Sequence, residues 1–169
     1  MDIQNIWIIT DTHFRHHRML ELCHRPEDYN EKIIQHWREN VQPDDLVIHL
    51  GDVAWPDGWE EGIIKTLPGR KVLVRGNHDS KSLPNLMTHG FDVAVDSMSM
   101  RLNGLDILFT HAPVEHNHDI NVHGHLHQMP APEFNSAHWC CALELQGYGV
   151  QNVASLFKLW RRIANEKKQ

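Results

Sequence analysis

The first half of the chain alternates short apolar runs with helical patterns. Apolar, β-branched runs extend from Ile3 to Ile9, from Leu46 to Leu50 and from Lys71 to Arg75. Continuous runs of this length are typical of strands that are buried on both faces, as in a parallel sheet. The sequence therefore predicts three buried strands in this half.

Helices are predicted between and after these strands. The segment from Tyr29 to Glu39 carries an apolar stripe that includes Ile33 and Trp37, and shorter helices are expected at 58–66 and 82–90. Strands that alternate with helices indicate βαβ units and hence a parallel sheet.

The second half has a different pattern. Strands are predicted at 91–95, 97–102, 105–110, 121–124 and 139–144, and a closing helix from Ala154 to about Lys168. Asn103-Gly104 is a strong signal for a type I′ hairpin. We expect this half to form mostly antiparallel sheet, which makes the fold class α/β with an α+β-like second half.

Composition narrows the class of protein. The chain has 169 residues, 41% of them hydrophobic and 22% charged, which fits a single soluble domain over residues 1–169. The net charge of −6 excludes a strongly basic nucleic-acid coat, although it leaves room for a local basic groove. No apolar run is long enough to span a membrane, and the amino end lacks a signal-peptide layout. Three cysteines, two of them adjacent, indicate no disulfide framework and a reducing cytoplasm.

Histidine is in excess, with 15 residues in the chain. Many of them, together with other metal-capable side chains, follow the predicted strand ends in five blocks: Asp11-Thr12-His13, Gly51-Asp52, Gly76-Asn77-His78-Asp79, His111, and Gly124-His125-Leu126-His127. Ligands of open α/β sheets bind beyond the carboxyl ends of the strands, so we expect the blocks to converge. Residues two apart on an extended chain point the same way, so Asp11 with His13, and His125 with His127, should reach one site as pairs.

The types of donor predict the chemistry of the site. Carboxylate and amide oxygens together with imidazole nitrogens, and without thiolate, suit Mn²⁺, Fe or Zn²⁺. The donors are too many for one ion, whereas two ions about 3.5–4 Å apart and bridged by a carboxylate would use them all. Such a pair makes a hydroxide nucleophile from a bridging water near neutral pH and neutralises phosphoryl oxygens. His78, beside Asn77 and Asp79, is suited to protonate a leaving oxygen.

The ordered set of blocks resembles the motifs of the calcineurin-like metallophosphoesterase superfamily. All five occur in the family's order between residues 11 and 127. The segments from Thr10 to Phe14 and from Pro68 to Asp79 are similar to a small bacterial and phage branch. The chain departs from that branch at 148–152, where a customary aromatic-x-Pro turn has no Pro.

The resemblance implies two β-sheets packed face to face with helices outside, and hydrolysis of phosphomonoesters or phosphodiesters with Mn, Fe or Zn. It places one metal on Asp11, His13, Asp52 and His127, and the other on Asp52, Asn77, His111 and His125, with Asp52 as the bridge. It makes His78 the general acid, positioned by Asp79.

Several alternatives remain open at this stage. The same fold can serve as a metal-binding scaffold for protein interaction without catalysis, although a scaffold would be expected to have lost ligands. His17 and Arg15 are candidates for contacts with substrate phosphate, and surface positions suit them as well. Trp55 and Trp59 fit either stacking on a base or packing within their loop. The sequence does not specify which phosphate ester is the substrate, and the candidates include nucleotides and nucleic acid. It does not specify the oligomeric state either.

Overall fold

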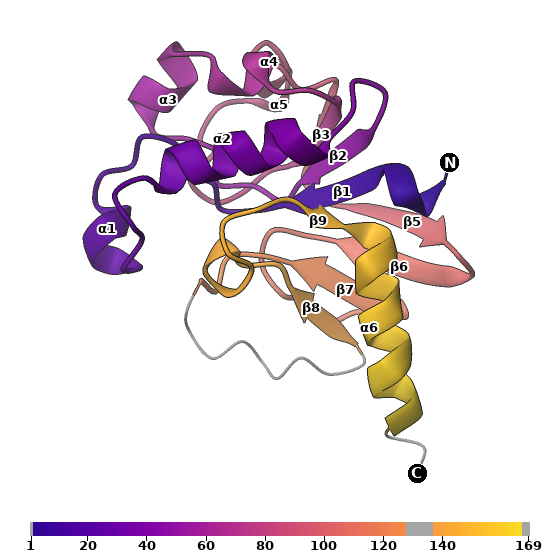
Figure 1. Ribbon diagram of the computed structural model, residues 1–169. Coiled ribbons are helices and arrows are strands. Elements are labelled where there is room, and N and C mark those ends of the chain that lie inside the picture. Colours follow the sequence, from indigo (N-terminus) through magenta and orange to yellow (C-terminus); the bar gives the residue numbers. More distant parts are fainter. Residues whose placement is uncertain (1, 128–136, 167–169) are drawn as a thin grey trace.

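The computed structural model describes residues 2–127 and 137–166, apart from the side chains of residues 159 and 162–166. Two β-sheets pack face to face and helices lie outside them (Figure 1). The strands are β1 (Ile6–Ile9), β2 (Leu46–His49), β3 (Arg70–Val74), β4 (Val93–Val95), β5 (Met98–Leu102), β6 (Leu105–Phe109), β7 (Ile120–His123), β8 (His138–Cys140) and β9 (Gln151–Asn152). The helices are η1 (Ile3–Asn5), α1 (Met19–Leu22), α2 (Tyr29–Asn40), α3 (Pro56–Glu60), α4 (Ile63–Thr66), α5 (Leu83–Met87), η2 (Leu143–Leu145) and α6 (Val153–Glu166).

The first sheet has the order β4-β3-β2-β1-β9. Neighbouring strands from β4 to β1 are parallel, and β9 adds an antiparallel edge next to β1. Because β1 and β2 are almost wholly buried, their side chains are apolar on both faces, except for His49 at the end of β2. The three predicted parallel strands are confirmed.

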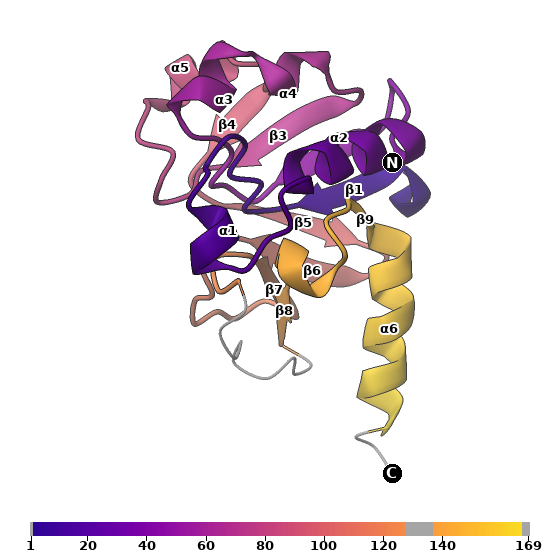
Figure 2. The same cartoon turned by 60° about the vertical axis from the view of Figure 1, so that its left-hand side comes forward.

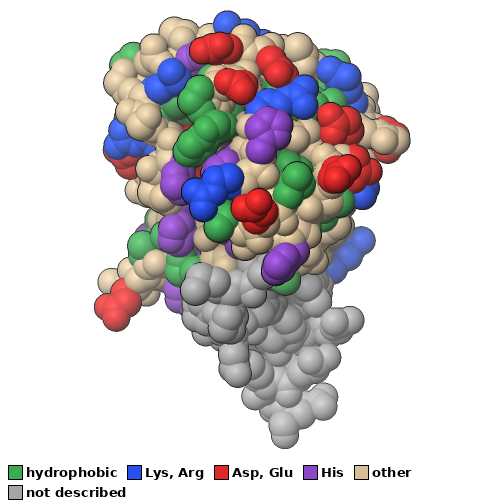
Figure 3. All heavy atoms as spheres, turned by 90° about the vertical axis from the view of Figure 1, so that its left-hand side faces the viewer, with side chains coloured by type: hydrophobic (Ala, Val, Ile, Leu, Met, Phe, Trp, Pro, Cys, Tyr) green, Lys and Arg blue, Asp and Glu red, His purple; other side chains and the backbone are tan. Residues whose placement is uncertain are grey.

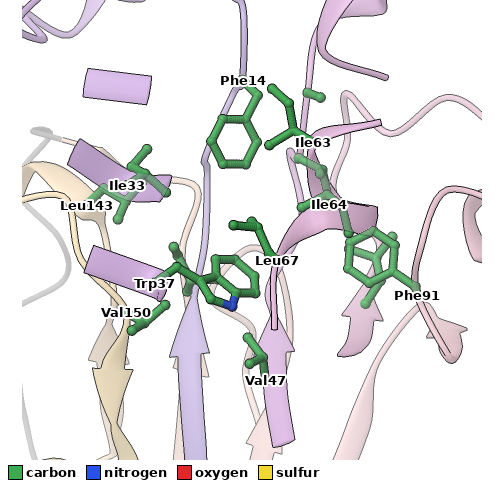
Figure 4. Close-up of a cluster of buried hydrophobic side chains, with 14 of the residues drawn as sticks. Phe14, Ile33, Trp37, Val47, Ile63, Ile64, Leu67, Phe91, Leu143 and Val150 are labelled. Carbon is green, nitrogen blue, oxygen red and sulfur yellow. The ribbon is translucent and has the colours of Figure 1, made fainter. Parts of the chain in front are cut away.

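Helices α2 to α5 cover the outer face of this sheet. Ile33 and Trp37 of α2 pack with Ile63, Ile64 and other buried side chains in one apolar cluster (Figure 4). The fully buried indole of Trp37 donates a hydrogen bond to the carbonyl of Pro68 at 3.0 Å. The cluster therefore fixes α2 over the strands and leaves the strand ends uncovered for other residues.

A second apolar cluster fills the space between the two sheets. Ile8 and Ile48 of the first sheet meet Phe109 and Val122 of the second, and Phe157 of α6 closes the side. Leu156 and Trp160 of α6 also pack against this cluster, and the far end of the helix extends past the sheets (Figures 1 and 2). This shared core holds the two sheets together.

The second sheet, β5-β6-β7-β8, corrects one prediction. The hairpin at Asn103-Gly104 is confirmed, with φ of 50° and 88°, and it makes β5 and β6 antiparallel. However, β7 runs parallel to both β6 and β8, and β4 joins the first sheet in parallel. The expectation of a mostly antiparallel second half is wrong. The long link from β6 to β7 returns the chain to the end of the sheet at which β6 began, so β7 runs in the same direction as β6.

Some boundaries also differ from the predictions. The helix expected at 58–66 is divided into α3 and α4 by Gly62 at φ 65°. The strand expected at 139–144 is β8, which ends at Cys140. The sequence did not predict α1 or β9. Residues 167–168, the end of the predicted closing helix, lie outside the described residues.

Two expectations drawn from composition can also be compared with the structure. All three cysteines are described and buried, and none forms a disulfide, as predicted. Across the described ranges, no helix is both long and apolar enough to cross a membrane.

Candidate metal centre

The five blocks meet at the edge of the molecule where β1, β2, β3, β6 and β7 end. Two groups have ligand atoms within 4.8 Å of one another: Asp11, His13 and His127 form the first group, and Asp52, His111 and His125 form the second. The amide oxygen of Asn77 lies 2.8 Å from Nε2 of His111 and so joins the second group. Figure 3 looks onto this side of the molecule, where several histidine side chains gather. All seven predicted ligand residues are therefore close together.

Asp52 lies between the two groups. Its Oδ2 is 3.6 Å from Nε2 of His13 in the first group and 3.4 Å from Nε2 of His111 in the second. Its Oδ1 accepts a hydrogen bond from the backbone N–H of His78 at 2.8 Å. One carboxylate therefore contacts both halves of the cluster.

Asp11 has an oxygen that accepts no hydrogen bond among the described residues. Its Oδ2 accepts hydrogen bonds from the hydroxyl of Thr10 and the backbone N–H of His125. Its Oδ1 is buried without a hydrogen bond among the described residues, although Nε2 of His127 is 3.8 Å away. Burial raises the pKa of Asp11. A buried carboxylate oxygen without a donor is costly, and a cation would satisfy it, so the residues fit a metal ion.

The backbone of the candidate ligands is strained. Asp11, His13, Asp52, His125 and His127 have positive φ values between 44° and 69°. The left-handed region is unfavourable for residues with a Cβ and is concentrated at functional sites. The two pairs do reach one site as predicted, but they do so through left-handed turns rather than through an extended chain.

Three glycines permit the close approach of these turns. Gly51, at φ 97°, lies so near Gly76 that a Cβ on either residue would collide with the other turn. Gly124 lies against Thr10 and Asp11, and its N–H donates to the carbonyl of His111 at 2.8 Å. A side chain at Gly124 would displace the Asp11 carboxylate.

The buried carboxylate of Asp79 binds backbone N–H groups. Its Oδ2 accepts hydrogen bonds from the N–H groups of Asp52 and Gly76, both at 2.9 Å, and its Oδ1 accepts one from Val53. These bonds occupy both oxygens, and no hydrogen bond between Asp79 and the His78 ring occurs in the described part. Asp79 ties together the turns after β2 and β3, and its role in positioning the His78 imidazole stays a prediction.

His78 is an exposed member of the cluster, like Asn77 and His125. Its side chain is 51% exposed, and its Nε2 lies 4.0 Å from Oδ2 of Asp52. Its ring is 5.6 Å from that of His13, centroid to centroid. A proton donor at this position is open to solvent and to an incoming substrate.

Charge differs between the buried histidines. Burial lowers the pKa of His111, but its contact with Asp52 and the charge of Asp11 outweigh burial and raise the pKa to about 9. Burial lowers the pKa of His13 to about 2. Nδ1 of His111 also contacts the carbonyl of Leu50 at 2.8 Å, which aims Nε2 into the site. Without a cation, His111 therefore carries the positive charge that Asp52 faces.

Two residues that support the first group, Glu144 and Arg25, carry no recognisable motif in the sequence. Glu144 contacts Nδ1 of His127 through Oε1 at 3.0 Å, and the same oxygen accepts hydrogen bonds from Arg25. Burial raises the pKa of Glu144, but its contacts with His127 and Arg25 bring the pKa down to about 2. A carboxylate behind a metal-binding histidine fixes the orientation of the ring.

Arg25 and Tyr29 also stabilise the strained turn after β1. The guanidinium of Arg25 donates to the carbonyls of Asp11 and Thr12, and the hydroxyl of Tyr29 donates to the carbonyl of His13. Three consecutive carbonyls are thus hydrogen-bonded by buried side chains. The turn that presents Asp11 and His13 is held by contacts that lie far from it in the sequence.

Cys23 lies behind His127 and forms a third group with His127 and Glu144. Burial raises the pKa of the Cys23 thiol, and the charge of Glu144 raises it further. A protonated thiol is a poor metal ligand, so the oxygen and nitrogen donors remain the better set.

The two predicted substrate contacts lie further out. His17 is exposed, and Arg15 pairs with Glu61 and Glu31 on the surface. The structure instead brings His16 to the cluster, with its ring 5.7 Å from that of His13. His17 and Arg15 remain predictions as substrate contacts.

His49 is a core residue, as predicted. It is fully buried, and its Nδ1 accepts from the N–H of Gly51 while Nε2 contacts the hydroxyl of Thr12. Both ring nitrogens are therefore used within the fold.

Comparisons with known proteins agree with this geometry. A model of the calcineurin-like phosphoesterase family matches residues 4–166. An uncharacterized protein of Methanocaldococcus jannaschii is 28% identical over 146 residues, which cover 79% of this chain and 76% of that protein. The gene 66 protein of Mycobacterium phage L5 is 33% identical over 96 residues, which cover 52% of this chain and 45% of the phage protein.

Two solved structures share the fold. The crystal structure of a protein of unknown function from Aquifex aeolicus has a TM-score of 0.79 and 26% identity, and the match covers 91% of this chain and 98% of that one. An archaeal protein described as a novel phosphodiesterase has a TM-score of 0.50 and 22% identity, over 84% of this chain and 87% of that one. Both resemble this chain in its two mixed sheets flanked by helices.

Replacing Glu144 by Gln should weaken metal binding about 10- to 100-fold, because the amide no longer holds His127 through a charged hydrogen bond. Competition between the protein and a chelating dye for Mn²⁺ measures this effect. Glu115→Gln, on an exposed loop residue, is the control. Unchanged Mn²⁺ affinity in Glu144→Gln would show that Glu144 does not position His127.

The raised pKa of His111 predicts a pH dependence of stability in chelator-treated protein. A pKa of about 9 in the folded chain, against an ordinary 6.5, stabilises the fold fully below pH 6.5, and this contribution disappears as the pH rises through 9. The melting-temperature difference between wild type and His111→Asn should therefore shrink from pH 6.5 to pH 9. A constant difference across this range would contradict the assignment of the charge to His111.

Proposed function

Because the chain belongs to the calcineurin-like phosphoesterase family, we propose that it is a hydrolase of phosphate esters that works with two divalent cations. The observation that carries the proposal is the position of Asp52. Its carboxylate is buried and contacts a histidine of each ligand group, which is the placement that a bridging ligand needs.

The cluster divides into two sets of ligands that share Asp52. Asp11, His13 and His127 would hold one cation with Asp52, and Asn77, His111 and His125 would hold the other. Oxygen and nitrogen donors of this kind suit Mn, Fe or Zn. The partnerless oxygen of Asp11 and the strained ligand turns favour a working site over a scaffold that only keeps the fold.

When bound, two cations in this site would polarise the phosphoryl oxygens and supply an activated water. The protein's own part is to place groups around the reacting phosphorus. His78 would donate a proton from Nε2 to the leaving oxygen, since its exposed imidazole lies beside Asp52 and is not one of the proposed ligands. His13 and His111 stay fixed, because both are buried.

The surface around the cluster has room for both substituents of a diester. A hollow of about 390 Å³ includes Asn77, His78 and Trp55, and another of about 710 Å³ includes Asn77, His111 and His125. Since Asn77 borders both, a phosphoryl group there would have space on two sides. We propose that phosphodiesters and phosphomonoesters both fit. We further propose a cytoplasmic location, in keeping with the three cysteines that form no disulfide.

The bridge assignment predicts that Asp52→Ala removes both metals. Wild-type protein loaded with Mn²⁺ and desalted should hold two ions per chain by elemental analysis, and Asp52→Ala should hold essentially none. Asp44→Ala, at an exposed aspartate away from the cluster, should keep both. Two ions retained in Asp52→Ala would refute the bridge.

The assignment of His78 as the acid predicts that His78→Asn keeps its metal and loses rate selectively. Turnover of an alkyl phosphate, whose leaving group needs a proton, should fall about 10²- to 10⁴-fold, while turnover of 4-nitrophenyl phosphate should fall much less. Steady-state kinetics with both esters measure the difference. Equal losses on the two esters would rule out proton donation by His78.

A further inference from the structure

Trp55 is a large aromatic side chain exposed at the edge of the metal centre. Its side chain is 43% exposed, whereas Trp37, Trp59 and Trp139 are buried. Its ring stacks on that of His16, with centroids 4.1 Å apart and planes inclined by 19°. The Trp55 and His78 ring centroids are 6.5 Å apart. A single exposed apolar residue needs no explanation, so its surroundings decide what it means.

The surroundings form a hollow with aromatic walls. Trp55, Pro56, Trp59 and His89 line it together with Asn77 and His78, and its volume is about 390 Å³. That volume lies within the usual range for pockets that bind small organic ligands. The hollow is therefore continuous with the candidate metal centre through Asn77 and His78.

The position of His78 indicates which part of a substrate enters the hollow. A general acid must reach the oxygen of the leaving group, so the leaving group extends from the phosphorus past His78. We propose that this hollow binds a nucleoside leaving group, and that Trp55 is the platform on which its base stacks. This proposal rests on the proposed phosphoesterase function.

A nucleoside fits the spacing better than a simple aryl or alkyl group. The separation of 6.5 Å between the rings of His78 and Trp55 leaves room for a spacer between the leaving oxygen and a stacked ring. In a nucleoside the sugar is that spacer, whereas an aryl ester has its oxygen directly on the ring. An alkyl group has no planar face to stack. Bases of every kind stack on tryptophan, so the platform predicts nucleosides as a class rather than one base.

The platform is held rigidly against the first ligand turn. The backbone N–H of Trp55 donates to the carbonyl of Phe14 at 2.9 Å, and Ala54 forms an isolated parallel β-bridge with Phe14. Gly58 lies so close that a Cβ would collide with the same carbonyl, and Pro56 begins α3. A side chain on a fixed backbone binds with little loss of conformational entropy. Trp55 is therefore prearranged with respect to Asp11 and His13.

Paired substrates that differ only in the base test the proposal. Adenosine 5′-monophosphate is compared with ribose 5-phosphate, and the methyl diesters of the two are compared in the same way, with Mn²⁺-loaded protein. In whichever pair is hydrolysed, kcat/KM should be roughly tenfold or more higher with the base than without it. Trp55→Ala should abolish this ratio, and Trp55→Phe should keep most of it.

A second variant distinguishes this hollow from its neighbour. Trp55 also borders a hollow that contains Leu22, His13 and His127. Leu22→Ala should retain the preference for the base, because Leu22 does not line the proposed pocket. If Leu22→Ala abolishes the preference and Trp55→Ala does not, the nucleoside lies elsewhere and the proposal is overturned.

Binding separates this proposal from the proposed function. Calorimetric titration with adenosine 5′-monophosphate and ribose 5-phosphate needs no turnover. Tighter binding of the nucleotide that is lost in Trp55→Ala supports the platform even if none of the four esters is hydrolysed, in which case the proposed phosphoesterase activity fails alone. Equal binding of the two ligands, or equal kcat/KM with and without the base, overturns the platform while leaving the hydrolase intact.

Discussion

Two carboxylates, Asp11 and Asp52, are buried within one shell of histidines. Burying them costs free energy, and much of the surrounding structure offsets that cost. Charges so close together in the interior are unfavourable unless donors or cations face them. Backbone N–H groups of His125 and His78 supply some donors, and His111 supplies a positive charge. One oxygen of Asp11 remains without a hydrogen bond among the described residues, so the protein alone does not satisfy the site.

The parallel pairing of β6 and β7 follows from the same requirement. His111 comes after β6 and His125 comes after β7, and their rings lie 4.9 Å apart. Antiparallel neighbours would place these two strand ends at opposite edges of the sheet, so the histidines could not share a ligand group. The face-to-face packing of the sheets then brings this edge against the ends of β1, β2 and β3. The strand directions in the second sheet thus decide whether its histidines reach the ligands that follow the strands of the first sheet.

The parallel strands β1, β2 and β3 and the ligand blocks were predictable because their signals are local. A buried run followed by Gly51-Asp52, or by Gly76-Asn77, is visible in a few residues. Pairing direction is not local: the run from 121 to 124 looks the same whether its neighbour is parallel or antiparallel. The supporting residues are less visible still, since Arg25 and Glu144 are 119 positions apart and neither belongs to a periodic pattern. The paired ligands come together through left-handed turns rather than along an extended chain, because propensity does not reveal where a fold imposes left-handed backbone on Asp11 or His127.

The hydrogen bonds of Asp79 help to divide the site into two parts that differ in how firmly they are held. Asp79, Arg25 and Tyr29 fix the backbone of the ligand turns through buried hydrogen bonds, so the candidate ligands are held in place before any ion arrives. His78 has no such brace on its ring and is half exposed. Prearranged ligands suit the part of the site that must hold charge in one geometry, whereas an unbraced imidazole can follow the leaving oxygen as the ester is cleaved. If the proposed hydrolase activity holds, substitutions around Trp55 and His78 should change which leaving group is accepted without disturbing the turns that carry Asp11, Asp52 and the histidines.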